Sequence, residues 1–225
     1  MTMELEASSR HYWDRTWSRF LRHQGMIAPS SKLVQQMIPH LQRHARVLDL
    51  GCGEGRNTIY LSRVGFHGVG LDLSRKAVKM LANNLFEEEV RGQGMVGDAR
   101  CLPFRTATFD GVLAHHLLDH LDGQGFAAAM AEVGRVLKPR GVLLLTMGNF
   151  VHLRDGREVT CRDDGSIVFT SGPNKGMLVR PYQDAALSDL GRQGWQVLKD
   201  ELTPRGSKIM LLRRLEAAGT DVARS

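Results

Sequence analysis

The fold is decided by the stretch Val47-Leu48-Asp49-Leu50-Gly51-Cys52-Gly53-Glu54-Gly55-Arg56-Asn57. It opens with a short, mostly apolar run of the kind that forms a buried strand. Three glycines at alternate positions follow, and they let the backbone turn tightly and let a ligand approach without obstruction by a Cβ. A helical pattern then covers residues 57–64. A strand, a glycine turn and a helix in this order predict a βα unit with a ligand at the turn.

The next predicted strand, residues 68–72, ends in Asp72, 21 residues beyond Gly51. A carboxylate there can accept hydrogen bonds from both ribose hydroxyls of a nucleoside. The glycine spacing is G-x-G-x-G, and Arg56 stands where a dinucleotide-binding loop would have its third glycine. Asp49, two residues before the first glycine, would repel a pyrophosphate but suits an ammonium group. Electrostatics therefore favour S-adenosylmethionine, which carries an ammonium and a sulfonium, over NAD.

The alternation of strand and helix patterns continues along the chain. Further strands are predicted at 95–98, 109–114 and 142–147, and further helices at 74–89, 126–137 and 184–193. This alternation predicts an α/β fold, a doubly wound and mostly parallel sheet with helices on both faces. Residues 195–198 and 208–212 form two last strands with no crossover helix between them, so they should pair antiparallel at the sheet edge. One domain is expected over residues 46–216.

Residues 1–45 precede this pattern and are expected to form an N-terminal helical lid. Apolar residues at helical spacing predict one helix over residues 9–21 and a second over residues 31–44. Pro39 should bend or shorten the second helix, because proline lacks the amide hydrogen that a helix interior uses.

Residues 150–180 interrupt the strand and helix rhythm. They contain Asp155-Gly156 and Asp164-Gly165, and Asp-Gly between short apolar runs is a hairpin signal. A hairpin insertion that caps the sheet is therefore predicted here. The last residues, 217–225, are expected to form a frayed tail.

The composition is typical of a core-forming chain. Of 225 residues, 42% are apolar, and no apolar run approaches the roughly 18 residues that a bilayer-spanning helix needs. The acidic N-terminus lacks the apolar region of a signal peptide, and the three cysteines form no C-x-x-C, so a cytoplasmic location is expected. The net charge of +6 comes from basic residues spread along the chain, which indicates a solvated surface rather than a nucleic-acid-binding arm.

Five segments in order resemble the class I S-adenosylmethionine-dependent methyltransferases. They are residues 47–55, 70–74, 97–104, 109–112 and 135–141. Within methyltransferase types 11 and 25, the run Gly55-Arg56-Asn57-Thr58-Ile59-Tyr60-Leu61 followed by Gly65-Phe66-His67 is most similar to tellurite-resistance-type small-molecule enzymes. The resemblance implies a single-domain Rossmann-like fold of seven strands, mostly parallel with an antiparallel last strand. It also implies S-adenosyl-L-methionine as cofactor and S-adenosyl-L-homocysteine as product.

The resemblance assigns cofactor-binding roles to residues at the carboxyl ends of the strands. Asp49, Gly51 and Gly53 would face the methionine part of the cofactor, and Asp72 would bind the ribose. The whole expected set is Asp49, Gly51, Cys52, Gly53, Asn57, Asp72, Leu73, Asp98, Ala99 and Ala114.

The adenine ring has its own candidates in this set. Leu73 would cover the ring, Asp98 would accept from its exocyclic amine, and the Ala99 amide would reach a ring nitrogen. An aspartate before a loop is also a common turn residue, which is the alternative for Asp98. Cys52 is expected to be a small loop residue rather than a catalytic thiol.

His115 is the candidate catalytic residue, because it follows the fourth predicted strand, where the family places residues beside the reactive methyl group. It could orient the acceptor or remove its proton. His116 and His120 share a helix face next to Asp119, but no H-E-x-x-H pattern is present and no metal is expected. A structural role for these histidines is the alternative.

The other candidate acceptor residues come from the lid and the insertion. Trp13 and Trp17 could pack in the core, or they could close over the cofactor with their aromatic faces. The expected acceptor-binding set is Tyr12, Trp13, Trp17, His116, Lys175, Arg180 and Tyr182.

The expected activity is transfer of a methyl group to a nucleophilic atom of a small molecule by in-line displacement. The alternatives are an RNA or protein methyltransferase, or a protein that binds S-adenosylmethionine without turnover. Enzymes that methylate base amino groups typically carry an Asn- or Asp-Pro-Pro-aromatic segment where this chain has Ala114-His115-His116-Leu117. A small-molecule acceptor is therefore the expected partner, with neither nucleic acid nor a membrane expected. The pattern specifies no oligomeric state.

Overall fold

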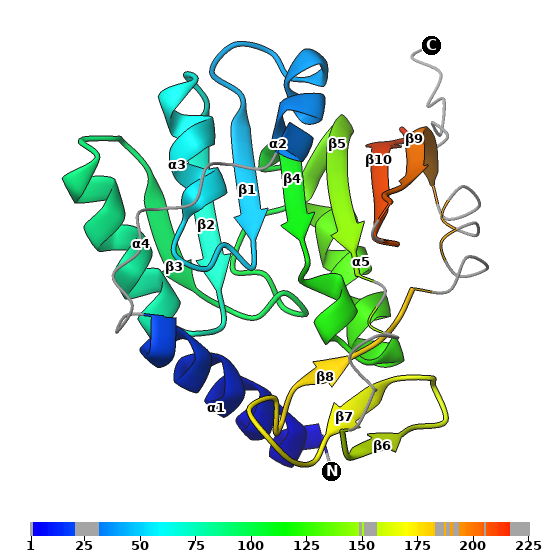
Figure 1. The fold of residues 1–225 in the computed structure, drawn as a ribbon. Helices are drawn as coiled ribbons and strands as arrows, with labels where there is room; N and C mark the ends of the chain where they lie inside the picture. The colour runs from blue at the N-terminus through cyan, green and yellow to red at the C-terminus, as the bar shows by residue number, and fades with distance from the viewer. Residues whose placement is uncertain are drawn as a thin grey trace.

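A seven-stranded sheet forms the centre of the structure, a computed structural model that describes residues 2–20, 32–148, 150, 157–182, 187, 190, 194–204 and 206–216. The strand order is β3-β2-β1-β4-β5-β10-β9 (Figure 1). The first five of these strands are parallel to one another. Strand β1 has β2 on one side and β4 on the other, so the order of the chain reverses at β1, as in doubly wound folds.

The elements of the main domain follow the predicted alternation. In chain order they are α1 (Thr2–Phe20), α2 (Lys32–Met37), η2 (Ile38–His40), β1 (Arg46–Leu50), α3 (Arg56–Arg63), β2 (His67–Asp72), α4 (Arg75–Glu87), β3 (Gln93–Val96), β4 (Phe109–His115), η3 (Leu118–His120), α5 (Gly123–Val136), β5 (Leu137–Met147), β9 (Trp195–Leu202) and β10 (Lys208–Arg214). The predicted seven-stranded, mostly parallel sheet is confirmed.

The two last strands pair antiparallel, as predicted, and β10 lies between β5 and β9. Strand β10 is antiparallel to both neighbours, with Met210 opposite Leu145 and Leu211 opposite Leu144. The buried β10 carries a continuous apolar run, whereas β9 at the edge is mostly exposed.

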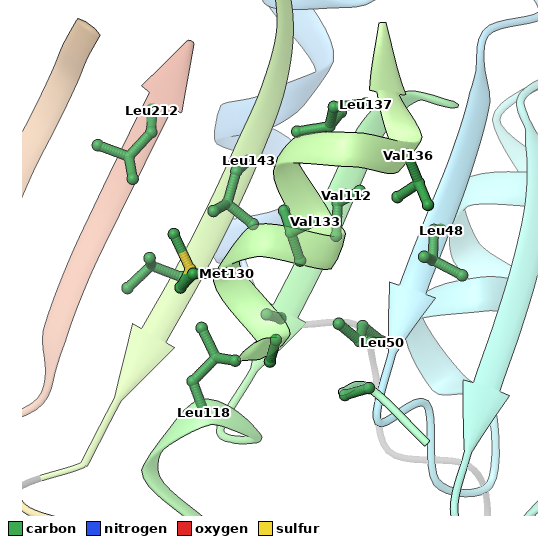
Figure 2. Close-up of a cluster of buried hydrophobic side chains, with 14 of the residues drawn as sticks. Leu48, Leu50, Val112, Leu118, Met130, Val133, Val136, Leu137, Leu143 and Leu212 are labelled. Atoms are coloured by element: carbon green, nitrogen blue, oxygen red, sulfur yellow. The ribbon is translucent and has the colours of Figure 1, made fainter. Parts of the chain in front are cut away.

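Side chains alternate between the two faces of the sheet, and helices cover both faces. On one face, Val47 and Leu144 pack with Val34 and Met37 of α2 and with Leu61 of α3. Figure 2 shows the opposite face, where helix α5 lies over the strands. The α5 residues labelled there are Met130, Val133 and Val136, and they pack with Leu48, Val112, Leu143 and Leu212.

Three predicted boundaries differ from the structure by five residues or more. The second helix does not reach residue 44, because α2 ends at Met37 and a 3-10 turn containing Pro39 follows. Helix α1 begins at Thr2 rather than at residue 9. Strand β5 begins at Leu137, directly after α5, rather than at residue 142. Arg140 has a φ of 65° in this strand, and the pairing with β4 shifts register.

The insertion forms three short antiparallel strands rather than a single hairpin: β6 (Val159–Cys161), β7 (Ile167–Phe169) and β8 (Leu178–Val179). Asp164-Gly165 makes the turn between β6 and β7, with Gly165 at a φ of 79°. This small sheet and α1 lie side by side at the edge to which the parallel strands point (Figure 1). Tyr12 of α1 packs with Phe169 and Val179 in a shared core.

Three predictions lie wholly or largely outside the described residues. They concern the turn at 155–156, the tail at 217–225 and the helix at 184–193, of which only Leu187 and Leu190 are described, both buried. Among the described residues, no helix is both long and apolar enough to cross a bilayer.

The glycine that begins α3 provides a test of local packing. Gly55 has a φ of 92° and Gly65 a φ of 93°, but a Cβ at Gly55 would overlap Leu81, whereas nothing lies within 4 Å of a Cβ at Gly65. The two positions have nearly the same φ, so alanine causes similar backbone strain at each. The difference between the two losses of stability therefore measures the overlap of the added Cβ with Leu81. We expect Gly55→Ala to lower the free energy of unfolding by about 1–3 kcal/mol more than Gly65→Ala. Urea denaturation measures both, and equal losses would contradict close packing of the loop on α4.

Candidate functional site

A cavity of about 380 Å³ opens at the carboxyl ends of β1, β2 and β4, where α1 passes over the sheet edge. Twelve of the predicted site residues line it: Trp13, Trp17, Gly51, Cys52, Gly53, Asn57, Asp72, Leu73, Asp98, Ala99, His115 and His116. Segments separated by about a hundred residues in the sequence thus meet in one pocket. The carboxyl edge beside a strand-order reversal is where doubly wound folds bind ligands.

The glycine loop is held in place by the ends of two strands. The Gly53 amide donates to Asp72 Oδ2 at 3.0 Å, and the Gly51 amide donates to the Leu71 carbonyl at 2.7 Å. Gly53 has a φ of 56°, and a Cβ there would lie 2.6 Å from the ring of Trp17. Only a residue without a side chain therefore fits between the turn and α1.

Asp72 ends β2 with its carboxylate at the cavity wall. Its Oδ2 accepts from Gly53 and its Oδ1 accepts from the Ser74 amide at 2.8 Å. Each oxygen can accept a second hydrogen bond, so the carboxylate is oriented but not saturated. Burial raises the pKa of Asp72 above its ordinary value, although the two backbone hydrogen bonds act to lower it.

Asp49 lies beneath the loop and does not line the cavity. Its Oδ2 accepts from the Thr58 amide at 3.0 Å and from the Thr58 hydroxyl at 2.7 Å, which ties β1 to α3. Burial raises the pKa of Asp49 to about 6, against the hydrogen bonds from Thr58 and the charge of Arg56, which lower it. Burial likewise raises the pKa of the Cys52 thiol, so this thiol is poorly ionised.

Asp98 and Ala99 lie in the loop after β3 at the far side of the cavity. The Arg100 guanidinium donates two hydrogen bonds to the Asp98 carboxylate, from Nε to Oδ1 at 3.0 Å and from Nη2 to Oδ2 at 2.6 Å. Burial acts to raise the pKa of Asp98, but the contacts with Arg100 outweigh it and the pKa is lowered. The carboxylate is therefore ionised and fixed in orientation.

His115 is the last residue of β4, and His116 follows it. His115 Nδ1 lies 2.8 Å from Thr146 Oγ1, and burial, with the charges of His116 and Arg56, lowers the pKa of His115 to about 3. His116 has a φ of 51°, and its Nδ1 lies 3.2 Å from the buried carboxylate of Asp119. His115 is thus neutral at physiological pH and a weak base.

His120 also lines the cavity, and its ring is fixed from three sides. Its Nδ1 lies 2.9 Å from the Leu178 carbonyl of β8. Trp13 packs edge-on against the ring with centroids 4.8 Å apart, and the Phe150 ring lies at 5.6 Å. A carbonyl only accepts, so Nδ1 carries the proton and a neutral ring has its lone pair on Nε2.

Six predicted site residues lie outside the cavity lining: Tyr12, Asp49, Ala114, Lys175, Arg180 and Tyr182. Tyr12 is buried in the shared core, where its hydroxyl donates to Met177 Sδ at 3.1 Å. The Lys175 carbonyl accepts from Arg15 at 2.6 Å, and the buried Arg180 guanidinium lies 4.8 Å from the Phe126 ring. The roles of Tyr12, Lys175, Arg180 and Tyr182 in acceptor binding remain predictions. The roles of Asp49 and Ala114 in cofactor binding do so too.

The cavity also contains residues that sequence reasoning did not assign to a ligand. These are Glu54, Arg56, Leu71, Gly97, Leu117, His120 and Leu121. Arg56 could have been found, because it is the first helical residue after the glycine loop and so must lie close to anything bound there. His120 could not, because its tie to Leu178 spans 58 residues.

No group of three or more His, Cys, Asp and Glu side chains that could hold a metal ion occurs in the described part of the chain. An organic ligand fits the lining better. Asn57 Oδ1 is buried without a hydrogen-bond partner among the described residues, and Asp72 has acceptor capacity to spare. Both groups are acceptors, which suits the ammonium and hydroxyl donors of a nucleoside that carries an amino acid.

Comparison with protein families identifies the domain. Residues 47–141 match the family model described as "Methyltransferase domain". These residues match a methyltransferase domain, and they contain the five segments that resemble the class I S-adenosylmethionine-dependent methyltransferases. The matched part contains the glycine loop, Asp72, Asp98 and the three histidines, so it covers most of the cavity. The tellurite-resistance subtype remains a prediction.

Relatives of the methyltransferase domain differ in their named acceptors. The chain is 40% identical over 108 residues to phthiotriol/phenolphthiotriol dimycocerosates methyltransferase 1 of Mycobacterium ulcerans, covering 45% of this chain and 36% of that one. It is 29% identical over 117 residues to 18S rRNA (guanine-N(7))-methyltransferase of Bos taurus, covering 49% and 40%. The chain thus spans less than half the length of these curated relatives.

A solved structure shares the fold over most of the chain. It is the Burkholderia thailandensis 1,6-didemethyltoxoflavin-N1-methyltransferase, determined with 1,6-didemethyltoxoflavin and S-adenosylhomocysteine bound. The TM-score is 0.63 at 20% identity, covering 88% of this chain and 83% of that one. The Rossmann-like methyltransferase fold therefore extends beyond the matched residues.

The buried carboxylate of Asp49 predicts a pH-dependent stability. Its pKa is about 6 in the folded chain and near 3.8 when unfolded, so the folded state binds more protons between these values. The free energy of unfolding should therefore fall as the pH rises from about 4 to about 6, by on the order of 2–3 kcal/mol. Asp49→Asn keeps an acceptor for Thr58 and should lose this part of the slope.

Urea denaturation at pH values between about 4 and 7.5 measures the effect. The difference between wild type and Asp49→Asn cancels the slope that Asp72 contributes to both proteins. Asp163→Asn, the same chemical change at an exposed position, is the matched control and should leave the slope intact. Parallel profiles for wild type and Asp49→Asn would contradict a raised pKa at Asp49.

Proposed function

We propose that this protein transfers the methyl group of S-adenosylmethionine to a nucleophilic atom of a small molecule. The observation that carries the proposal is the position of Asp72. Its carboxylate lines the cavity at the end of β2, oriented by two backbone amides, and stands opposite the glycine loop. This is the place where a nucleoside's ribose hydroxyls are bound in doubly wound folds.

Different cavity residues would bind different parts of the cofactor. Asp72 would accept from the ribose hydroxyls, Asn57 Oδ1 from the ammonium group, and Arg56 would face the carboxylate of the methionine part. Asp98 and the Ala99 amide would hold the adenine edge, with Leu73 against the ring. Asp49 would act from below the loop by its negative charge. When bound, S-adenosylmethionine supplies an electrophilic methyl group on a sulfonium.

The acceptor would lie under α1, against Trp13, Trp17, Leu117 and Leu121. This wall is aromatic and aliphatic, and α1 closes it by hydrogen bonds to both sides: Ser74 donates to Asp14 at 2.5 Å, and Arg15 donates to the Lys175 carbonyl. A pocket roofed in this way suits a small molecule better than a polymer. Exclusion of water and alignment of the nucleophile with the methyl group are the main requirements of the reaction.

Two of the three cavity histidines, His115 and His120, would contact the acceptor in different roles. His115 has its pKa lowered to about 3, so it would position the acceptor rather than take its proton. His120 has its Nδ1 proton bound to Leu178, so its Nε2 lone pair is the better proton acceptor. Nε2 would take the proton of an acceptor hydroxyl or amine as the acceptor atom bonds to the methyl carbon and the bond from that carbon to the sulfonium sulfur breaks, which leaves S-adenosylhomocysteine.

Calorimetric titration with S-adenosylmethionine, S-adenosylhomocysteine and NADH tests the cofactor. We expect saturable binding of the first two, and at least about tenfold weaker binding, roughly 1.4 kcal/mol, in Asp72→Asn. Asp163→Asn, with the same change of charge at an exposed position, should bind as the wild type does. Binding of NADH alone would overturn the cofactor assignment, and binding without turnover of any acceptor would leave a non-enzymatic role.

The histidine roles are tested with an acceptor found by screening hydroxyl and amine compounds for release of S-adenosylhomocysteine. His120→Asn keeps a donor toward Leu178 but removes Nε2, so kcat should fall by about 10²-fold or more with little change in KM. His115→Asn should mainly raise KM. A larger loss of kcat in His115→Asn than in His120→Asn would reverse the two assignments.

A further inference from the structure

A second cavity, of about 410 Å³, lies at the opposite edge of the sheet, at the amino ends of β1, β2 and β3. Its lining consists of Arg46, His67, Gly68, Val69, Arg91, Gly92 and Gln93. Two arginines, a histidine and an amide donor face it, and none of the described residues that line it carries a carboxylate. The methyltransferase site is at the other end of the same strands, so this cavity has no part in it.

The three basic residues form a row across neighbouring strands. Arg46 and His67 are register partners on β1 and β2. Val69 of β2 and Gln93 of β3 are also register partners. His67 lies two residues before Val69 and Arg91 lies two residues before Gln93, so His67 and Arg91 are level with each other. Adjacent strands are about 4.8 Å apart, so the row places basic groups side by side on one face. Like charges in this arrangement are destabilising unless an anion lies between them.

The charges in this row are not neutralised by the protein. The Arg46 guanidinium lies 5.4 Å from the Phe109 ring, a contact that orients it without cancelling its charge. Asp110, the nearby carboxylate, accepts from the Arg46 amide at 2.9 Å with one oxygen and from Lys138 at 2.7 Å with the other. Within the described residues, neither Arg46 nor Arg91 forms an ion pair.

Stabilisation of helix ends does not explain the row. Basic residues are favourable in the last turn of a helix, and Arg63 at the end of α3 is such a case. Arg46 and His67 instead begin strands, and Arg91 precedes one, so none of the three lies on a helix. A bound anion gives this arrangement a physical reason.

We propose that the cavity formed by Arg46, His67 and Arg91 binds a phosphoryl group. Guanidinium groups bind phosphate oxygens in pairs, and two of them flanking an imidazole match a di- or polyphosphate better than a single carboxylate. The phosphoryl group could belong to a phosphorylated metabolite or to the backbone of a nucleic acid. Both sources present the same chemistry to the row.

Titration calorimetry with pyrophosphate at low ionic strength tests the proposal on the whole protein. We expect saturable binding at one site, weakened at least about tenfold in the double variant R46Q/R91Q. The matched control is R140Q, because Arg140 is an exposed arginine of β5 that does not line the cavity. Its affinity for pyrophosphate should stay within about twofold of wild type.

A thermal unfolding measurement separates binding from folding. The double variant should unfold within a few degrees of wild type, because relief of the like charges offsets loss of the contact between Arg46 and the Phe109 ring. A fall in unfolding temperature of more than about 5 °C would mean that the arginines act structurally and would overturn the proposal. Absence of saturable pyrophosphate binding, or an equal loss in R140Q, would overturn it as well.

Fluorescence anisotropy with a short single-stranded RNA distinguishes the two sources. Binding that pyrophosphate displaces and that R46Q/R91Q weakens would assign the phosphoryl group to a nucleic-acid backbone. Pyrophosphate binding without RNA binding would assign it to a small phosphorylated metabolite. Either result supports the site.

Discussion

The loop after β1 is joined to β2 by hydrogen bonds from the Gly51 and Cys52 amides to the Leu71 carbonyl, and by one from the Gly53 amide to the Asp72 carboxylate at 3.0 Å. This bond orients the carboxylate along the cavity wall and fixes the loop at the distance that leaves room for the Trp17 ring. The same carboxylate accepts from Ser74, whose side chain caps α4 and donates to Asp14 of α1. The Asp72 carboxylate thus links the glycine loop and β2 to the cap of α4 and, through Ser74, to α1.

Two ionised carboxylates buried near the same loop lower the stability of the ligand-free protein. Burial raises the pKa of both Asp49 and Asp72, so ionising them works against folding. A cationic ligand would relieve part of this cost, and an anionic one would add to it. The same negative charges that destabilise the ligand-free loop would therefore favour binding of a sulfonium cofactor.

The two cavities at opposite edges of the sheet differ in their charged lining. The carboxyl-edge cavity is lined by Asp72 and Asp98, with Asp49 buried beneath its loop. The amino-edge cavity is lined by the basic row of Arg46, His67 and Arg91. These three basic residues are spread along the sequence and meet only in the fold. Positions far apart in the sequence come together because parallel strands all begin at one edge and end at the other.

The sequence by itself determined the strand and helix alternation, the glycine turn and the position of Asp72, because these depend on periodicity and on short spacings. Ten of the twelve predicted residues that line the cavity follow from the same logic, since parallel strands bring their carboxyl ends together, whereas Trp13 and Trp17 lie on α1. The tertiary structure alone decided the rest. Tyr12 is drawn into a core with Met177, 165 residues away, and His120 is fixed by Leu178. Such contacts depend on how the lid and the small sheet pack, which no local pattern of residues encodes.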